Sequence, residues 1–100
     1  QGLAKNWTQV KGTDTWALND SFNTSSASDQ GTGYYRVNFT SSFNNIYYSA
    51  HATQDSGGWG LNGCTDDATT SYYQVYSMQT DTTGAEDATR ANSTAHGDLA

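Results

Sequence analysis

The side chains in this sequence that could carry out acid-base chemistry are carboxylates that lie close together along the chain. The acidic pairs are Asp14 with Asp20, Asp66 with Asp67, and Glu86 with Asp87. A glycosidase needs one carboxyl group with a raised pKa in a cleft, whereas adjacent acids in a polar, Gly-rich stretch are usually solvated. The sequence also lacks a Gly-rich phosphate loop, a G-x-S-x-G motif and an H-E-x-x-H motif. We therefore expect a non-enzymatic protein.

Metal binding has a weak candidate in the two histidines, His51 and His96, which lie on separate expected strands. If they meet in space, they could ligate a metal together with Asp98 or Asp66. The alternative is an outward-facing His51 and a His96 near the chain end. The spaced Asp/Asn pattern of a calcium loop is absent. The single cysteine, Cys64, excludes an internal disulfide, and we expect no cofactor.

Aromatic residues are the stronger binding signal. Trp59 lies in the Gly-rich run 57–60, where no sheet face requires a large side chain, and stacking on a sugar ring is a common use of such a residue. Its alternative role is to cap the core or an intersubunit seam. Trp7 and Trp16 lie on strand-like segments, so we expect both in the core.

Composition limits the classes of partner. The 100 residues carry a net charge of -6 and only four Lys and Arg residues, so no basic stripe is available for nucleic acid or an anionic membrane. No apolar run is long enough to cross a bilayer. Ile, Leu, Val and Phe number only 11, but the 13 aromatic residues can supply a thin core. A core this small favours association with other subunits.

The elements that must position these residues are short strands. Tyr35, Val37 and Phe39 alternate with polar residues, as a half-buried strand requires. Strands are expected over residues 5–11, 15–22, 34–40, 45–53, 71–80 and 87–96, with a polar turn before residue 34 and a reversal at residues 31–33. The sequence therefore predicts a single all-β domain over residues 1–100, a small antiparallel β-sandwich with long loops and negligible helix.

Three finer expectations follow from side-chain size and polarity. In the strand 45–53, one face with Ile46, Tyr48, Ala50 and Ala52 is expected to be buried, with His51 on the other. The strand 71–80 has no plainly polar side, which suggests burial on both faces. The small residues of 87–96 suit a strand against which another part of the structure packs closely, and a neighbouring subunit is one candidate. The polar segments 54–68 and 81–86 are expected to be loops, and the first is the leading contact surface.

Five Asn-x-Ser/Thr triplets begin at Asn6, Asn19, Asn23, Asn38 and Asn92. A secreted glycoprotein would use such sites, but a chain with 26 Ser and Thr residues contains several by chance. We expect Asn23 and Asn38 to be sheet-surface residues.

Residues 20–26 (DSFNTSS) and 29–40 (DQGTGYYRVNFT) together resemble a segment of the C-terminal domains of bacteriophage tail fibres and related virion appendages, including those of cyanophages. The upstream residues 16–19, the following 44–48 and the ending 96–100 fit as well. Thr24 stands where the pattern has Val. The resemblance implies a non-enzymatic all-β module that is the C-terminal piece of a longer virion protein. It also implies that the module forms a homotrimer and contacts other virion proteins.

The resemblance and the aromatic residues together predict a receptor-binding tip domain, or adhesin, that contacts a host surface polysaccharide through Trp59, Tyr47, His51 and Tyr72. Replacing Trp59 with Ala is then expected to abolish adsorption. The alternative is a structural virion module, such as a head fibre, capsid decoration or fibre connector. A third possibility is an appendage that binds polysaccharide while a separate domain cleaves it.

Overall fold

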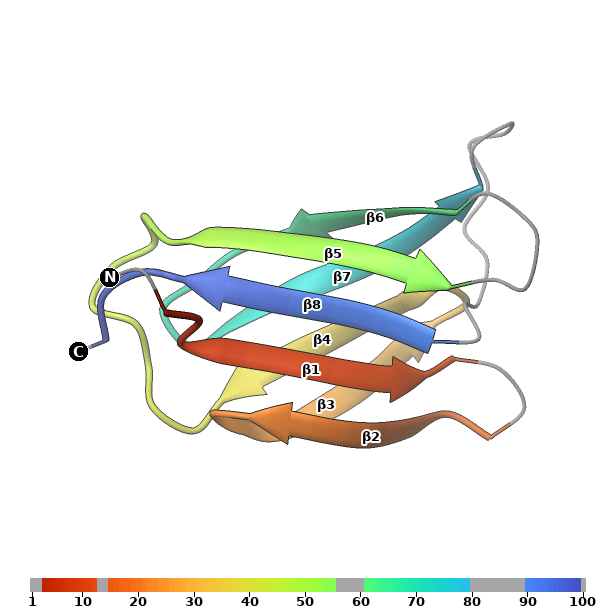
Figure 1. Cartoon of the computed structure of the whole chain (residues 1–100), viewed down its shortest axis with the longest axis horizontal. Coiled ribbons are helices and arrows are strands. Elements are labelled where there is room, and N and C mark those ends of the chain that lie inside the picture. The colour runs from red at the N-terminus through yellow and green to blue at the C-terminus, as the bar shows by residue number, and fades with distance from the viewer. Residues whose placement is uncertain (1–2, 13–14, 56–60, 80–89, 100) are drawn as a thin grey trace.

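The computed structural model describes residues 3–12, 15–55, 61–79 and 90–99, and it shows two four-stranded antiparallel sheets stacked on each other (Figure 1). The strands are β1 (Asn6–Lys11), β2 (Ala17–Phe22), β3 (Thr24–Gly31), β4 (Tyr34–Phe39), β5 (Ser49–Asp55), β6 (Leu61–Asp66), β7 (Tyr72–Gln79) and β8 (Arg90–His96). Sheet A has the order β2-β1-β8-β5 and sheet B the order β3-β4-β7-β6. The prediction of an all-β antiparallel sandwich is confirmed. Within the described residues, no helix is long and apolar enough to span a membrane.

The six predicted strands are present, but their limits differ and two further strands were missed. β5 begins at Ser49, so the stretch expected to open it, including Ile46, lies in the connection after β4 and Ile46 is exposed. β3 replaces the expected polar turn, and β6 occupies part of the segment 54–68 that was expected to be a loop. Both lie at edges of sheet B. An edge strand pairs through its backbone, so the polar, hydroxyl-rich β3 needs no apolar alternation.

Asn23 is the single residue between β2 and β3, where the chain passes from sheet A to sheet B. Its φ is 55°, in the left-handed region that Asn tolerates better than most residues. Its side-chain amide donates to the carbonyl oxygens of Lys5 and Ser41, at 2.9 and 3.1 Å, and accepts from the Ser41 amide at 2.7 Å. Asn23 is therefore a structural joint and not a simple sheet-surface residue.

The expected reversal before β4 is confirmed at Thr32 and Gly33, with φ values of 148° at Gly31 and 67° at Gly33. Both values favour glycine because a Cβ atom would strain the backbone there. The Gly33 carbonyl accepts a hydrogen bond of 2.7 Å from the Ser77 amide. This bond holds the turn against β7, so the turn fixes where β4 begins.

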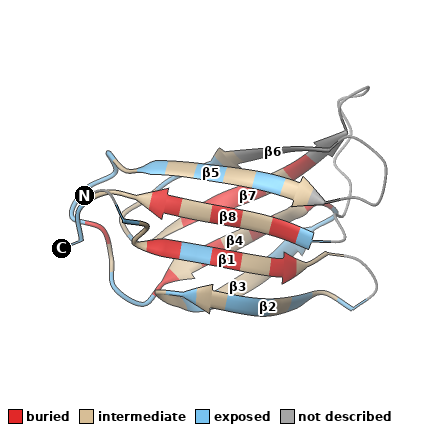
Figure 2. Ribbon diagram, viewed as in Figure 1, coloured by how far each residue is buried: buried red, intermediate tan, exposed pale blue. Residues whose placement is uncertain are grey.

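The interior is filled mainly by aromatic residues of sheet B and small residues of sheet A. Buried positions alternate along β1 and β8, as Figure 2 shows. The buried apolar residues of the described part are Val10, Tyr35, Val37, Phe39, Phe43, Tyr73, Val75, Ala91 and Ala95. Small β8 side chains leave room for sheet B rings, since the Tyr73 hydroxyl reaches within 2.8 Å of Ser93 Oγ. The close approach expected at β8 is thus made by the other sheet of the same chain.

Candidate functional site

The four residues predicted to bind a ligand do not form one cluster. Trp59 lies outside the described residues. Tyr47 is 85% exposed in the connection between β4 and β5. His51 lies on the outer face of sheet A, because its neighbours Ala50 and Ala52 pack against the core. Tyr72 alternates with the buried Tyr73, so it lies on the outer face of sheet B, on the opposite side of the molecule.

The outer face of sheet A carries a shallow groove of about 240 Å³ between β5 and β8, which we call the β5–β8 groove. Its lining residues are His51, Ala52, Thr53, Asn92, Ser93 and Thr94. The register places His51 opposite Thr94 and Thr53 opposite Asn92, so these four side chains share the outer face. The groove is therefore bordered by an imidazole, two hydroxyls and an amide, which can both donate and accept hydrogen bonds.

An aromatic pair continues this surface across the sheet. Trp7 on β1 lies opposite Thr94 on one side and Phe22 on the other, which places Phe22, Trp7, Thr94 and His51 in one row across the four strands. Trp7 is 37% exposed and Phe22 is 52% exposed. The expectation that Trp7 is a core residue is therefore wrong. Its neighbours Asn6 and Thr8 point inward instead, because the interior contains a hydrogen-bonded polar network that no hydrophobic pattern indicates.

Hydrogen bonds along the outer face fix the polar side chains next to Trp7. Gln9 Nε2 donates to Asn92 Oδ1 at 3.0 Å, and Asn92 Nδ2 donates to the Thr53 carbonyl at 3.3 Å. At the far side, Ser49 Oγ and His51 Nε2 are 2.8 Å apart. Side chains held in this way lose less conformational freedom when a ligand binds. The polar border of the groove is thus largely preformed.

The buried network lies directly behind the groove and is centred on Ser93. Ser93 Oγ lies 2.6 Å from Thr8 Oγ1 and 2.8 Å from the Tyr73 hydroxyl, which is 3.0 Å from Asn6 Oδ1. Asn6 Nδ2 in turn donates to the carbonyls of Phe22 and Asn23 and to Thr24 Oγ1. The network ties β1, β7 and β8 to the joint between the sheets. It therefore positions the strands that carry Trp7 and Thr94.

Burial in this interior raises the pKa of several tyrosines. Desolvation raises the pKa of Tyr35 to about 12, against a smaller lowering by the nearby hydroxyls of Ser93 and Thr8. The Tyr35 hydroxyl nevertheless has no well-formed hydrogen bond in the structure. Desolvation also raises the pKa of Tyr73, with the Ser93 hydrogen bond acting in the opposite direction. These phenols therefore stay neutral in any ordinary buffer.

The two histidines do approach each other, as one of the metal hypotheses requires. The ring centroids of His51 and His96 are 6.4 Å apart. Among the described residues, however, no group of three or more His, Cys, Asp or Glu side chains could hold a metal ion. Neither Asp98 nor Asp66 thus completes a site with this pair.

The Asn-x-Ser/Thr triplet at residues 6–8 is structural. Asn6 is fully buried and both ends of its side-chain amide are hydrogen-bonded. Asn23 uses its amide within the joint described above. Neither side chain is available to a glycosyltransferase in the folded protein.

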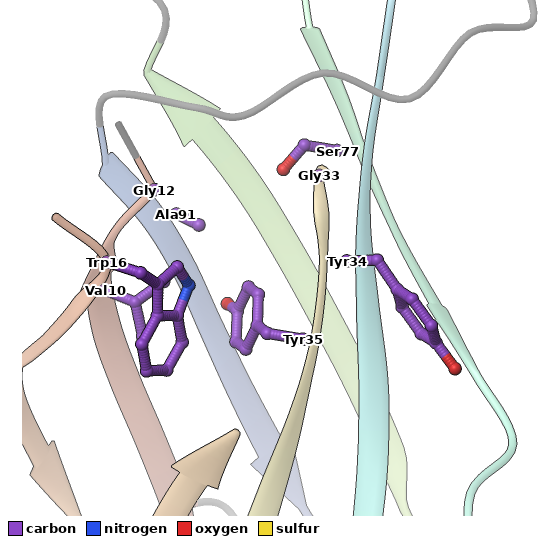
Figure 3. A pocket seen from close by; sticks show the side chains of 8 residues that line it. All are labelled: Val10, Gly12, Trp16, Gly33, Tyr34, Tyr35, Ser77 and Ala91. Atoms are coloured by element: carbon purple, nitrogen blue, oxygen red, sulfur yellow. The ribbon is translucent and has the colours of Figure 1, made fainter. Parts of the chain in front are cut away.

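A second hollow lies at the end of the sandwich where Trp16 packs beside the Tyr35 ring, with ring centroids 6.1 Å apart (Figure 3). Trp16 packs against the core, as expected from the sequence. The hollow has a volume of about 10 Å³, close to the minimum that one water molecule needs. It is too small for a sugar or a cofactor, so the β5–β8 groove is the better candidate site.

Comparison of the chain with models of known protein families, with curated proteins and with solved structures found no match.

Proposed function

We propose that this chain is a non-catalytic glycan-binding domain, and that the β5–β8 groove with the neighbouring Trp7 ring forms its binding surface. The observation that carries the proposal is the row of Trp7, Thr94 and His51 across adjacent strands of an outward face. A pyranose ring has an apolar face that stacks on an aromatic ring and hydroxyls that both donate and accept hydrogen bonds. Trp7 supplies the first requirement, and the groove side chains supply the second.

The charge of the chain favours a neutral glycan. The net charge is -6, which repels polyanions such as strongly acidic capsular or phosphate-rich polysaccharides. The described lining of the groove contains no Lys or Arg. A neutral surface polysaccharide of the host is therefore the proposed ligand class.

The proposed setting is the tip of a bacteriophage tail fibre, where the domain acts as a host-attachment adhesin in a homotrimer. Support comes from the likeness of residues 20–40 to fibre C-terminal domains and from the antiparallel two-sheet fold. The interior supports association as well, because several of its buried side chains are polar or small and add little hydrophobic stabilisation. These residues are Asn6, Thr8, Ala91, Ser93 and Ala95. Sedimentation of the isolated domain as a stable folded monomer would count against the trimer.

The test is binding of the purified domain to an array of bacterial surface polysaccharides, with Trp7→Ala as the main variant and Ile46→Ala as the control. Both residues are exposed, but Ile46 lies in the connection between β4 and β5 and is not one of the residues that line the groove. We expect Trp7→Ala to weaken binding about tenfold, the loss that 1.4 kcal/mol produces, and Ile46→Ala to leave it unchanged. Equal binding by both variants would contradict the assignment of the groove.

A structural virion module is the second candidate, and the exposed Trp7 and Phe22 pair favours it. Two large rings side by side on one face, 37% and 52% exposed, suit a contact with another virion subunit as well as a sugar. The two functions predict different results for Trp7→Ala. Loss of assembly with polysaccharide binding retained would support the structural module, as would density for the chain on the capsid instead of the tail tip.

A further inference from the structure

The outer face of sheet B carries a second aromatic surface, which we call the tyrosine face. It consists of Tyr34, Arg36, Tyr72, Gln74 and Tyr76, with Asp67 beside them. Tyr34 and Arg36 alternate with the buried Tyr35 and Val37, and the register pairs them with Tyr76 and Gln74 on β7. All five side chains therefore project from the same side of the sheet, away from the β5–β8 groove.

Two of the tyrosines form a stacked pair. The ring centroids of Tyr34 and Tyr76 are 4.3 Å apart and the rings are inclined by only 13°. Figure 3 shows the Tyr34 ring pointing away from the core, on the opposite side of the sheet from Tyr35. A stacked pair that stands on two adjacent strands presents a rigid aromatic wall, since neither ring can turn without displacing the other.

A chain of hydrogen bonds fixes this wall in place. The Tyr34 hydroxyl donates to Gln74 Oε1, and Gln74 Nε2 donates to Asp67 Oδ2 at 2.9 Å. Asp67 has a φ of 51°, in the left-handed region, directly after β6. Gln74 is only 4% exposed although it projects outward. The side chains around Gln74 therefore form a built surface and not a set of independently solvated groups.

Arg36 lies opposite Gln74, and its guanidinium reaches Tyr72 at the other end of the face. Its guanidinium carbon lies 4.1 Å from the centroid of the Tyr72 ring, in a cation–π contact. The structure shows no ion pair between Arg36 and any described residue. The guanidinium is thus held in a fixed position by a ring, while its donors have no carboxylate partner in this part of the chain.

We propose that the tyrosine face is a second glycan-binding site, which takes a neutral pyranose against the Tyr34 and Tyr76 wall. The site offers an aromatic surface, a donor group in Arg36 and an acceptor in Asp67, and a polyol uses all three. A carboxylate or phosphate ligand would be repelled, because the two negative charges of Asp66 and Asp67 outnumber the single positive charge of Arg36. A purely apolar ligand would leave the Arg36 donors without partners.

The Tyr76 hydroxyl is a neutral group at the pH of any natural medium. A hydrogen bond to Tyr34, which favours the neutral Tyr76 phenol, raises the pKa of Tyr76 to about 12, and desolvation adds to this effect. A neutral phenol can donate a hydrogen bond to a sugar hydroxyl, whereas a phenolate can only accept one. Because the two proposed sites lie on opposite faces of the sandwich, one chain would engage two sugar units at once, which strengthens attachment to a repetitive polysaccharide.

The test is an NMR titration of the isotope-labelled chain with methyl glycosides of neutral hexoses, with a uronate-containing oligosaccharide as a parallel arm. We expect saturable shift changes at Tyr34, Arg36 and Tyr76 with at least one neutral sugar. Tyr76→Ala should weaken this binding about tenfold. Tyr76→Phe, which keeps the ring, should weaken it less than about threefold, and each variant must first give a folded spectrum.

Trp7→Ala separates this site from the β5–β8 groove. That variant should remove shift changes on sheet A and leave those of the tyrosine face intact. The two site assignments are therefore tested independently. The proposal is overturned if no neutral sugar perturbs the tyrosine face or if only the uronate does. It is also overturned if Tyr76→Ala leaves sugar affinity unchanged, or if that variant instead abolishes self-association measured by sedimentation.

Discussion

The Tyr73 hydroxyl meets the Asn6 side-chain amide inside the sandwich, with 3.0 Å between the phenol oxygen and Asn6 Oδ1. An amide oxygen can only accept, so the Tyr73 hydroxyl is the donor in this bond. The same hydroxyl also lies 2.8 Å from Ser93 Oγ. The two contacts connect sheet B to the two central strands of sheet A.

Removing the Tyr73 hydroxyl should destabilise the fold, whereas removing the Tyr35 hydroxyl should not. Tyr73→Phe leaves a buried amide oxygen without its donor, which costs about 1–3 kcal/mol. Tyr35→Phe deletes a buried hydroxyl that has no well-formed hydrogen bond, so stability should stay the same or rise by about 1 kcal/mol. Urea unfolding of both variants measures the difference. A larger loss in Tyr35→Phe than in Tyr73→Phe would contradict this account of the core.

Stability should fall at alkaline pH because buried tyrosines must ionise. The pKa of Tyr35 rises from 10.0 to about 12 on folding, so between these values the unfolded state has lost a proton that the native state keeps. Stability is therefore fully present below pH 10.0 and decreases as pH rises toward about 12. Full loss for Tyr35 amounts to about 3 kcal/mol. The pKa of Tyr48 rises to about 12 as well, and desolvation is the main cause.

The measurement is the urea midpoint at a series of pH values from neutral to strongly alkaline. Tyr35→Phe provides the control, because it removes one of the ionising groups and should flatten the curve. A midpoint that stays constant through the alkaline range would contradict the burial of these phenols.

The joint at Asn23 should depend on both its conformation and its side-chain hydrogen bonds. Asn23→Gly keeps easy access to the left-handed region but loses the bonds to Lys5 and Ser41. Asn23→Ala loses the same bonds and adds about 1–2 kcal/mol of backbone strain. We expect Asn23→Ala to be less stable than Asn23→Gly by about 1 kcal/mol in chemical denaturation. Equal stabilities would show that the φ of 55° is not required.

Gly97 should not tolerate a side chain. A Cβ atom at this position would lie 2.6 Å from Tyr48 Cβ and 3.2 Å from Phe43 Cδ2, where the two rings stack with centroids 4.3 Å apart. Gly97→Ala must therefore displace backbone or aromatic groups, at a cost of about 1–3 kcal/mol. Thr40→Ala, at an exposed position, is the control with little expected change. A melting temperature of Gly97→Ala equal to that of the control would contradict the close packing.

Much of the fold follows from the sequence alone. The alternation of Tyr35, Val37 and Phe39 with polar residues determines β4 and its buried face, because side chains of a strand point to opposite sides in turn. The small residues of β8 likewise indicate a strand that packs closely against another element, and Ala91 and Ala95 are buried as that pattern requires. The turn glycines before β4 determine where the chain reverses. These features are local, so the order of residues is sufficient to predict them.

The tertiary structure alone decided how the faces are used. In β1 the alternation does not identify the buried face, because Asn6 and Thr8 lie inside in a hydrogen-bonded polar network and Trp7 lies outside. The polar segments β3 and β6 are strands because their backbones pair with β4 and β7 at the edges of sheet B. This pairing does not depend on the apolar alternation that their sequences lack. The pairing of strands far apart in sequence placed His51 and Tyr72 on opposite faces. Periodicity carries no information on such long-range pairing, so the sequence predicted one surface for residues that the fold places on two opposite faces.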